Sequence, residues 1–264
     1  MNVDLRWLVP LAALCTQAAL AVPVHSWQED LSARLRITSV VPEASAAALD
    51  GARASVFYSD GSSAQALFLG FESAFLRTSV ASAPEFVLVA TTDGSDLSFP
   101  ALSISNLDRT RTLTGFRIDG RGDGDGHAAF DRGLGSFSTN PSTEGSSTGR
   151  DLLLDFDRRS FLRGTVDVTY SNPLGLGDAA PVGDLFSTVD VRLDLSTVIG
   201  LPPVTAFGAV FSSIDFSTDI DSVTYAPLAG PGPDPGHGVP APSMASLLLA
   251  ALATWLLQRS RCRA

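Results

Sequence analysis

Residues 189–195 read Val-Asp-Val-Arg-Leu-Asp-Leu, an unbroken alternation of apolar and charged side chains. A period of two is typical of a β-strand that buries one face and leaves the other in water. Residues 166–170, Val-Asp-Val-Thr-Tyr, repeat the pattern. Strands with one wet face favour an antiparallel sheet, because parallel sheets are usually covered on both faces.

Nine further strands are predicted along the chain, and turns rich in Gly, Asp, Asn, Ser and Pro separate them. Helical periodicity is nearly absent, and only the alanine-rich residues 42–53 suit a short helix. We therefore predict an all-β fold over residues 22–228, an antiparallel β-sandwich of the jelly-roll type with an appended N-terminal hairpin. The nine strands are expected at residues 36–41, 54–58, 66–71, 86–91, 97–105, 112–119, 151–156, 206–214 and 220–225.

The first 21 residues are typical of a secretory signal peptide. An apolar stretch follows Arg6, and Ala19, Leu20 and Ala21 form a small–x–small cleavage pattern that leaves Val22 as the first mature residue. The sequence thus predicts a signal helix at residues 1–21 and export by the secretion machinery.

The chain ends in a proline pair, an apolar run and an arginine-rich end. Residues 239–243 read Val-Pro-Ala-Pro-Ser, and residues 244–258 are predicted as a transmembrane helix, although a comfortable span needs about 20 apolar residues. The basic end, residues 259–264, carries Arg259, Arg261 and Arg263, which favour the cytoplasmic side and leave the body outside. A Pro/Gly-rich linker, residues 229–238, is expected to hold the body clear of the membrane.

Residues 239–264 resemble the PEP-CTERM sorting signal of Gram-negative bacteria, in which a Pro-Glu-Pro motif precedes a transmembrane segment and a basic end. Val239, Pro240, Pro242 and Ser243 fit that pattern, whereas Ala241 stands where the family has Glu. The resemblance implies an exosortase-type transpeptidase as a partner and delivery to the envelope, the cell surface or an extracellular polysaccharide matrix. It implies no chemistry for the body, which looks like the largely uncharacterised β-domains that carry such tails.

The composition of the body narrows the classes of function. The chain has no lysine and a net charge of −10, which disfavours nucleic acid and anionic lipid as partners. Both cysteines, Cys15 and Cys262, lie in the end segments, so the body has no disulfide and no cysteine nucleophile. There is no Gly-x-Ser-x-Gly elbow and no phosphate-binding Gly-Lys-Ser/Thr sequence. We therefore expect a protein that is not an enzyme.

A glycine-rich loop is the first candidate site. Residues 119–127 read Asp-Gly-Arg-Gly-Asp-Gly-Asp-Gly-His, and the carboxylates of Asp119, Asp123 and Asp125 are the hard ligands that Ca²⁺ takes. The EF-hand register fails, since Phe130 or Leu134 falls where the twelfth-position Glu belongs. An acidic surface loop whose glycines serve the backbone is the alternative interpretation.

A second acidic segment contains Asp215, Asp219 and Asp221 at even spacing. On a single strand these side chains would share one face. We expect that face to point outward, over a buried face that contains Phe216 and Ile220. A paired-carboxylate hydrolase requires two acids flanking a cleft, which spacing within one strand does not establish.

The leading hypothesis is an exported, non-catalytic surface or matrix protein that needs no cofactor. A carbohydrate- or Ca²⁺-binding surface module is the alternative, and a polysaccharide-acting hydrolase is the third. Exopolysaccharide is an expected partner in the matrix. Phenylalanine outnumbers tryptophan and tyrosine together, 15 against 6, which favours core packing over a sugar platform.

Overall fold

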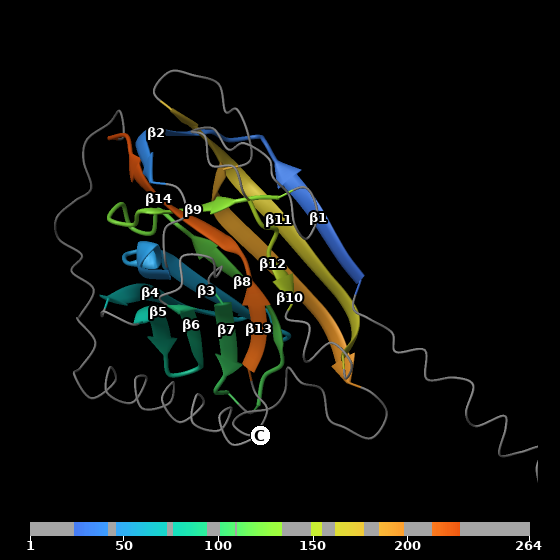
Figure 1. The fold of residues 1–264 in the computed structure, drawn as a ribbon. Helices are drawn as coiled ribbons and strands as arrows, with labels where there is room; N and C mark the ends of the chain where they lie inside the picture. Colours follow the sequence, from blue (N-terminus) through green and yellow to red (C-terminus); the bar gives the residue numbers. More distant parts are fainter. Residues whose placement is uncertain are drawn as a thin grey trace, which may run out of the picture.

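The computed structural model describes residues 24–41, 46–72, 76–93, 101–108, 110–133, 149–154, 162–176, 185–197 and 213–227. Over these ranges the predicted all-β fold is confirmed, with fourteen strands and the 3-10 helix η2 (Ala46–Leu49) inside the alanine-rich segment (Figure 1). Residues 1–21 and 229–264, with the predicted signal helix, linker and sorting tail, lie outside them. None of the described helices has the length and apolar character to cross a membrane.

The strands follow one another along the chain with short connections where these are described. They are β1 (Val24–Asp30), β2 (Leu35–Val41), β3 (Arg53–Tyr58), β4 (Ser63–Glu72), β5 (Leu76–Ala83), β6 (Phe86–Asp93), β7 (Ala101–Asn106), β8 (Leu113–Asp119), β9 (Ala128–Asp131), β10 (Leu153–Leu154), β11 (Leu162–Leu176), β12 (Leu185–Thr197), β13 (Ser213–Ser217) and β14 (Asp219–Tyr225). The predicted strands at 166–170 and 189–195 are the centres of β11 and β12, whereas β1, β5 and β9 were not predicted.

Five strands, in the order β1–β11–β12–β8–β3, form a continuous platform. Their register places apolar residues of alternate positions opposite one another, and one such row is Trp27, Val168, Val191, Phe116 and Val56. The last four of these are buried in the main hydrophobic core, and the partly buried Trp27 packs against that core. Because successive side chains of a strand point to opposite faces, the intervening polar residues share the other face of the platform.

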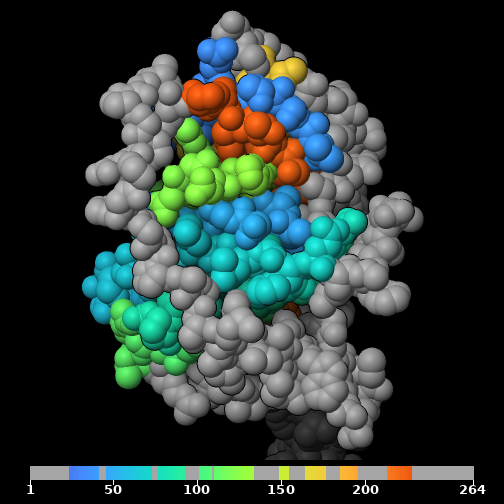
Figure 2. Space-filling view, turned by 90° about the vertical axis from the view of Figure 1, so that its left-hand side faces the viewer, coloured from blue at the N-terminus to red at the C-terminus, as the bar shows by residue number. Residues whose placement is uncertain are grey.

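At one end of the platform the strands close into a ring. β11 pairs with β12, β12 with β9, β9 with β14, β14 with β2, and β2 again with β11. On the surface seen in Figure 2, β14 lies between β2 and β9, which are distant from it in the sequence. The ring encloses a small apolar cluster that includes Ile37, Leu174 and Val223.

Strand β4 connects the platform to the other half of the sheet. Its first part, residues 63–67, pairs with β3, and residues 68–72 pair with β5. From there the order continues through β6, β7 and β13 to β10. Phe116 on β8 meets Phe216 on β13 edge to face, with 5.4 Å between ring centroids, so the apolar faces of the two halves touch.

The first two strands, β1 and β2, do not form a hairpin. β1 and β2 do not pair with each other; both run parallel to β11, β1 against residues 165–171 and β2 against residues 174–176. The chain therefore follows one edge of β11 and leaves it only at residues 31–34. The prediction of a wholly antiparallel sheet fails at these two pairings, while the other pairings are antiparallel.

Candidate binding groove

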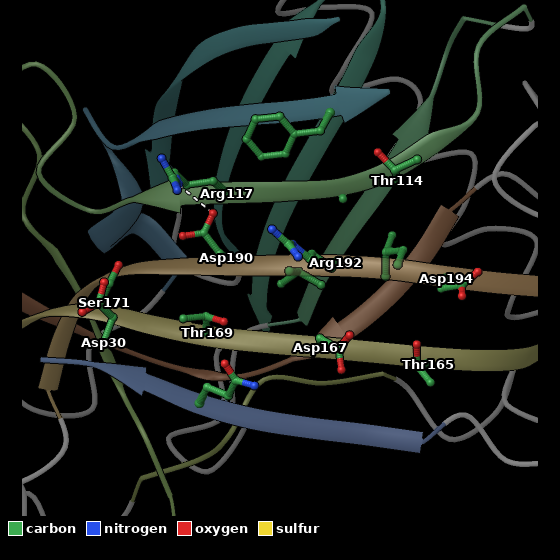
Figure 3. A pocket seen from close by; sticks show the side chains of 15 residues that line it. Asp30, Thr114, Arg117, Thr165, Asp167, Thr169, Ser171, Asp190, Arg192 and Asp194 are labelled. Carbon is green, nitrogen blue, oxygen red and sulfur yellow. Dashed lines mark hydrogen bonds and ion pairs between the residues drawn. The ribbon is translucent and has the colours of Figure 1, made fainter. Parts of the chain in front are cut away.

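The outward face of the platform is hollowed into an open groove of about 920 Å³. Figure 3 shows its side chains standing on β1, β11, β12 and β8. Most of the lining residues carry a hydroxyl, carboxylate, guanidinium or amide group. The full lining consists of Gln28, Asp30, Phe57, Thr114, Gly115, Arg117, Thr165, Asp167, Thr169, Ser171, Asp190, Val191, Arg192, Leu193 and Asp194.

Strand register arranges these groups in rows that cross the strands. One row runs from Ser26 through Asp167, Arg192 and Gly115 to Phe57. The next row, two residues further along β11, consists of Gln28, Thr169, Asp190, Arg117 and Ser55. Neighbours within a row are about 5 Å apart, so their functional groups are close enough to contact one ligand together.

The charged groups of the groove are partly paired with one another. Arg117 donates from Nε to Oδ1 of Asp190 at 2.7 Å, and Ser26 Oγ donates to Oδ1 of Asp167 at 2.5 Å. Both Arg117 and Arg192 are exposed. Four carboxylates face two guanidinium groups, so the groove carries a small negative charge that disfavours an anionic ligand.

Asp30 lies at the end of β1 and closes one side of the groove. Hydrogen bonds from the side chain and backbone of Ser32 lower the pKa of its carboxyl below the ordinary value. A hydrogen bond to the charged form favours ionisation. This carboxylate therefore accepts hydrogen bonds, and hydroxyl groups of a ligand are suitable donors.

The glycine-rich loop 119–127 is packed against the protein backbone. A side chain at Gly122 would bring its Cβ to 2.0 Å from the carbonyl oxygen of Gly51, and Gly122 has a φ of +57°. Asp123 forms an ion pair with Arg53, while Asp119 accepts a hydrogen bond from the backbone N–H of Arg121 at 3.1 Å. The glycines allow this close approach, which is the backbone role that the alternative interpretation gave them.

Asp125, the third predicted calcium ligand, is exposed in the same loop. Within the described ranges, no group of three or more His, Cys, Asp or Glu side chains is placed to hold a metal ion. Asp119, Asp123 and Asp125 are thus close in sequence but do not form a ligand set in this structure.

The second acidic segment differs from its prediction. Asp215 lies on β13 and Asp219 and Asp221 lie on β14, with the chain passing between the strands at Thr218. All three side chains are buried, at 7%, 3% and 0% exposure, so the predicted outward face is wrong. The residues on the opposite faces of these strands, among them Phe216 and Ile220, are buried as well, so neither face of β13 or β14 is the wet face of a sheet. Ser103 Oγ donates to Asp215 Oδ1 at 2.6 Å, which meets part of the requirement for partners of a buried carboxylate.

Arg132 links another buried carboxylate, that of Asp151, to the edge of the platform. Its guanidinium contacts Asp151, which is 1% exposed, with 3.3 Å between Nε and Oδ1, and also pairs with Glu29 of β1. The same group lies 5.6 Å from the ring centroid of Tyr170, a fully buried side chain. Tyr170 in turn accepts a hydrogen bond from the backbone N–H of Leu152 at 2.8 Å. These contacts are structural, since they join β1, β11 and the segment around β10.

Sequence reasoning missed the groove, although it predicted the polar faces of β11 and β12 that form its floor. The missing information was the register that aligns β1, β8 and β3 with them. The predicted signal-cleavage and sorting residues, Ala19 to Val22 and Val239 to Ser243, and the basic residues Arg259, Arg261 and Arg263 lie outside the described ranges. No family model, no curated protein and no solved structure matches this chain.

Proposed function

We propose that this chain is an exported, non-catalytic β-protein that binds a neutral polysaccharide in the groove of its platform. The groove itself carries the proposal, because rows of hydroxyl, carboxylate, amide and guanidinium groups offer many donors and acceptors on one open face. Sugars present closely spaced hydroxyl groups, which such rows can engage without a deep cavity. The excess of carboxylates favours neutral over anionic polymers.

The PEP-CTERM-like tail supports the proposed setting. Export by the signal peptide, anchoring through residues 244–258 and processing by an exosortase-type transpeptidase would deliver the body to the cell surface or the extracellular matrix. Exopolysaccharide is abundant there, so the location and the groove favour the same ligand class. Deleting residues 239–264 is expected to move the protein from the membrane fraction to the medium, and identical fractionation of both forms would contradict the anchor.

We also propose that the two sheet halves form a sandwich of the jelly-roll type with the five-stranded ring at one end. The edge-to-face contact of Phe116 with Phe216 supports it, since these rings come from opposite halves. A sandwich of this kind gives the platform a dry inner face and leaves its outer face for binding.

Affinity electrophoresis in gels that contain neutral polysaccharides tests the binding proposal. The mature protein is expected to be retarded by at least one neutral polymer. Asp167→Asn and Arg192→Gln should reduce the retardation, because both side chains are central in the groove and neither belongs to the core. Arg77→Gln, an exposed change on β5 away from the groove, is the control and should migrate like wild type. Unretarded migration of wild type across the panel would contradict the proposal.

A further inference from the structure

We infer that Phe57 and the gap above Gly115 form a stacking subsite for a neutral hexopyranose ring, an assignment that rests on the proposed polysaccharide binding. Phe57 is the one aromatic side chain among the described residues that line the groove. It lies on β3 at the end of the row that contains Asp167, Arg192 and Gly115.

The space beside Phe57 arises from its small neighbours. Its partner on the neighbouring strand β8 is Gly115, which has no side chain, and its partner on the other neighbour, β4, is Ser63. A Cβ at Gly115 would come within 2.3 Å of the carbonyl oxygen of Val191, so close strand packing keeps this position free of a side chain. The row therefore has a gap one residue wide between the guanidinium of Arg192 and the half-buried ring of Phe57.

The chemistry on the two sides of this gap differs. An aromatic ring presents an apolar, electron-rich face, which suits the axial C–H groups of a pyranose whose hydroxyls are equatorial. Arg192 offers several N–H donors in a planar fork, which suits neighbouring sugar hydroxyls. A hexopyranose in the gap would stack on Phe57 and turn its hydroxyl edge towards Arg192 and Asp167.

This placement also sets the direction of the polymer. The row from β1 to β3 crosses five strands, and four spacings of about 4.8 Å make it roughly 19 Å long. A β-linked glucose polymer lying along the row would meet polar groups at the β1 end and the aromatic ring at the β3 end. Its uncharged residues would avoid the repulsion that the four carboxylates exert on uronic acids.

The test uses calorimetric titration of the mature protein with cellohexaose, with an oligomannuronate of equal length as the anionic comparison. Wild type should bind cellohexaose and show weaker or no binding of the oligomannuronate. Phe57→Leu keeps an apolar side chain beside Gly115 but removes the aromatic face, and it should weaken cellohexaose binding about 2- to 10-fold. Phe57→Trp should bind at least as tightly as wild type.

Melting temperatures of the same variants distinguish a loss of the stacking contact with the sugar from a loss of protein stability. Phe57→Leu should melt close to wild type, so a loss of affinity then reports the ligand contact. Equal cellohexaose affinity of wild type and Phe57→Leu would overturn the subsite, as would tighter binding of the oligomannuronate. If Phe57→Leu binds cellohexaose like wild type while Arg192→Gln and Asp167→Asn reduce retardation by a neutral polysaccharide, the proposed function stands without the subsite. If wild type binds no neutral polysaccharide at all, both the proposed function and the subsite are wrong.

Discussion

Replacing Arg132 by Met is expected to destabilise the protein far more than replacing a surface arginine. The Arg132 side chain is 15% exposed and that of its partner Asp151 is 1% exposed, so the change removes a cation from a buried carboxylate. Breaking a buried pair from one side costs about 3–5 kcal/mol, and the 3.3 Å contact places this one near the lower limit. The pairing with the partly exposed Glu29 adds at most about 1 kcal/mol.

The expected total is about 3–4 kcal/mol, which for a domain of this size lowers the melting temperature by roughly 6–16 °C. Differential scanning calorimetry of Arg132→Met and of the control Arg77→Met measures the difference. Arg77 and Glu72 are 48% and 62% exposed, so breaking their pair should cost no more than about 1 kcal/mol.

A double variant tests the physical reason for this cost. Arg132→Met combined with Asp151→Leu replaces both charged groups by apolar ones, which is often close to neutral for a buried pair. The double variant should therefore melt above Arg132→Met alone. If Arg132→Met melts within about 3 °C of Arg77→Met, or if the two changes in the double variant simply add, the assigned role of Arg132 is wrong.

Three further predictions concern ionisation, the glycine-rich loop and calcium. Burial raises the pKa of Tyr170 and of Tyr225, so both phenols should stay neutral in the folded state above about pH 10. Their contribution to stability should be constant below that pH and should be lost as the pH rises above it; ultraviolet titration of native and unfolded protein should show the difference. Gly122→Ala should lower the melting temperature more than Gly124→Ala, because both have positive φ but only Gly122 has backbone atoms, those of Gly51, in the way of a Cβ; equal shifts would mean that the loop is not packed as described. Adding CaCl₂ should leave the melting temperature unchanged, since Asp123 is paired with Arg53, and a clear rise would restore the calcium hypothesis.

The sequence was sufficient for the strands with strict alternation and insufficient for their neighbours. Val189 to Leu195 and Val166 to Tyr170 alternate without interruption, and they form the centres of β12 and β11. The pairing of β1 with β11 joins residues about 140 positions apart, as Ser26 and Asp167 show, and nothing local to either strand encodes it. The parallel pairing of β1 with β11 could therefore not be predicted from the sequence.

The burial of the acidic residues on β13 and β14 could likewise not be predicted from the local sequence pattern. Asp190 and Asp194 alternate with apolar residues and face the groove, as the pattern predicts. Asp215 and Asp221 show the same alternation, yet they are buried, as are Phe216 and Ile220 on the opposite faces of β13 and β14. An alternation of polar and apolar residues shows that a strand has one polar and one apolar face. Whether water reaches the polar face depends on the tertiary structure around the strand.

The groove could be predicted only in part. Its floor, from Thr165 to Ser171 and from Asp190 to Asp194, follows from the two alternating strands. Its extent depends on Gly115 and Phe57, whose positions in the row are set by the register of β8 and β3. Phenylalanine in alternating positions was expected to be core, and Phe116 and Phe216 are, but Phe57 falls on the opposite face of its strand from Val56.

Backbone chemical-shift mapping by NMR tests the central proposal most directly. The ligand is an oligosaccharide fragment of a neutral polysaccharide that retards the mature protein in affinity electrophoresis. We expect the largest perturbations on residues 165–171 and 188–194, with smaller ones on residues 26–30 and 114–117. Perturbations centred on the loop 119–127 or on residues 213–221, with the platform unchanged, would contradict it.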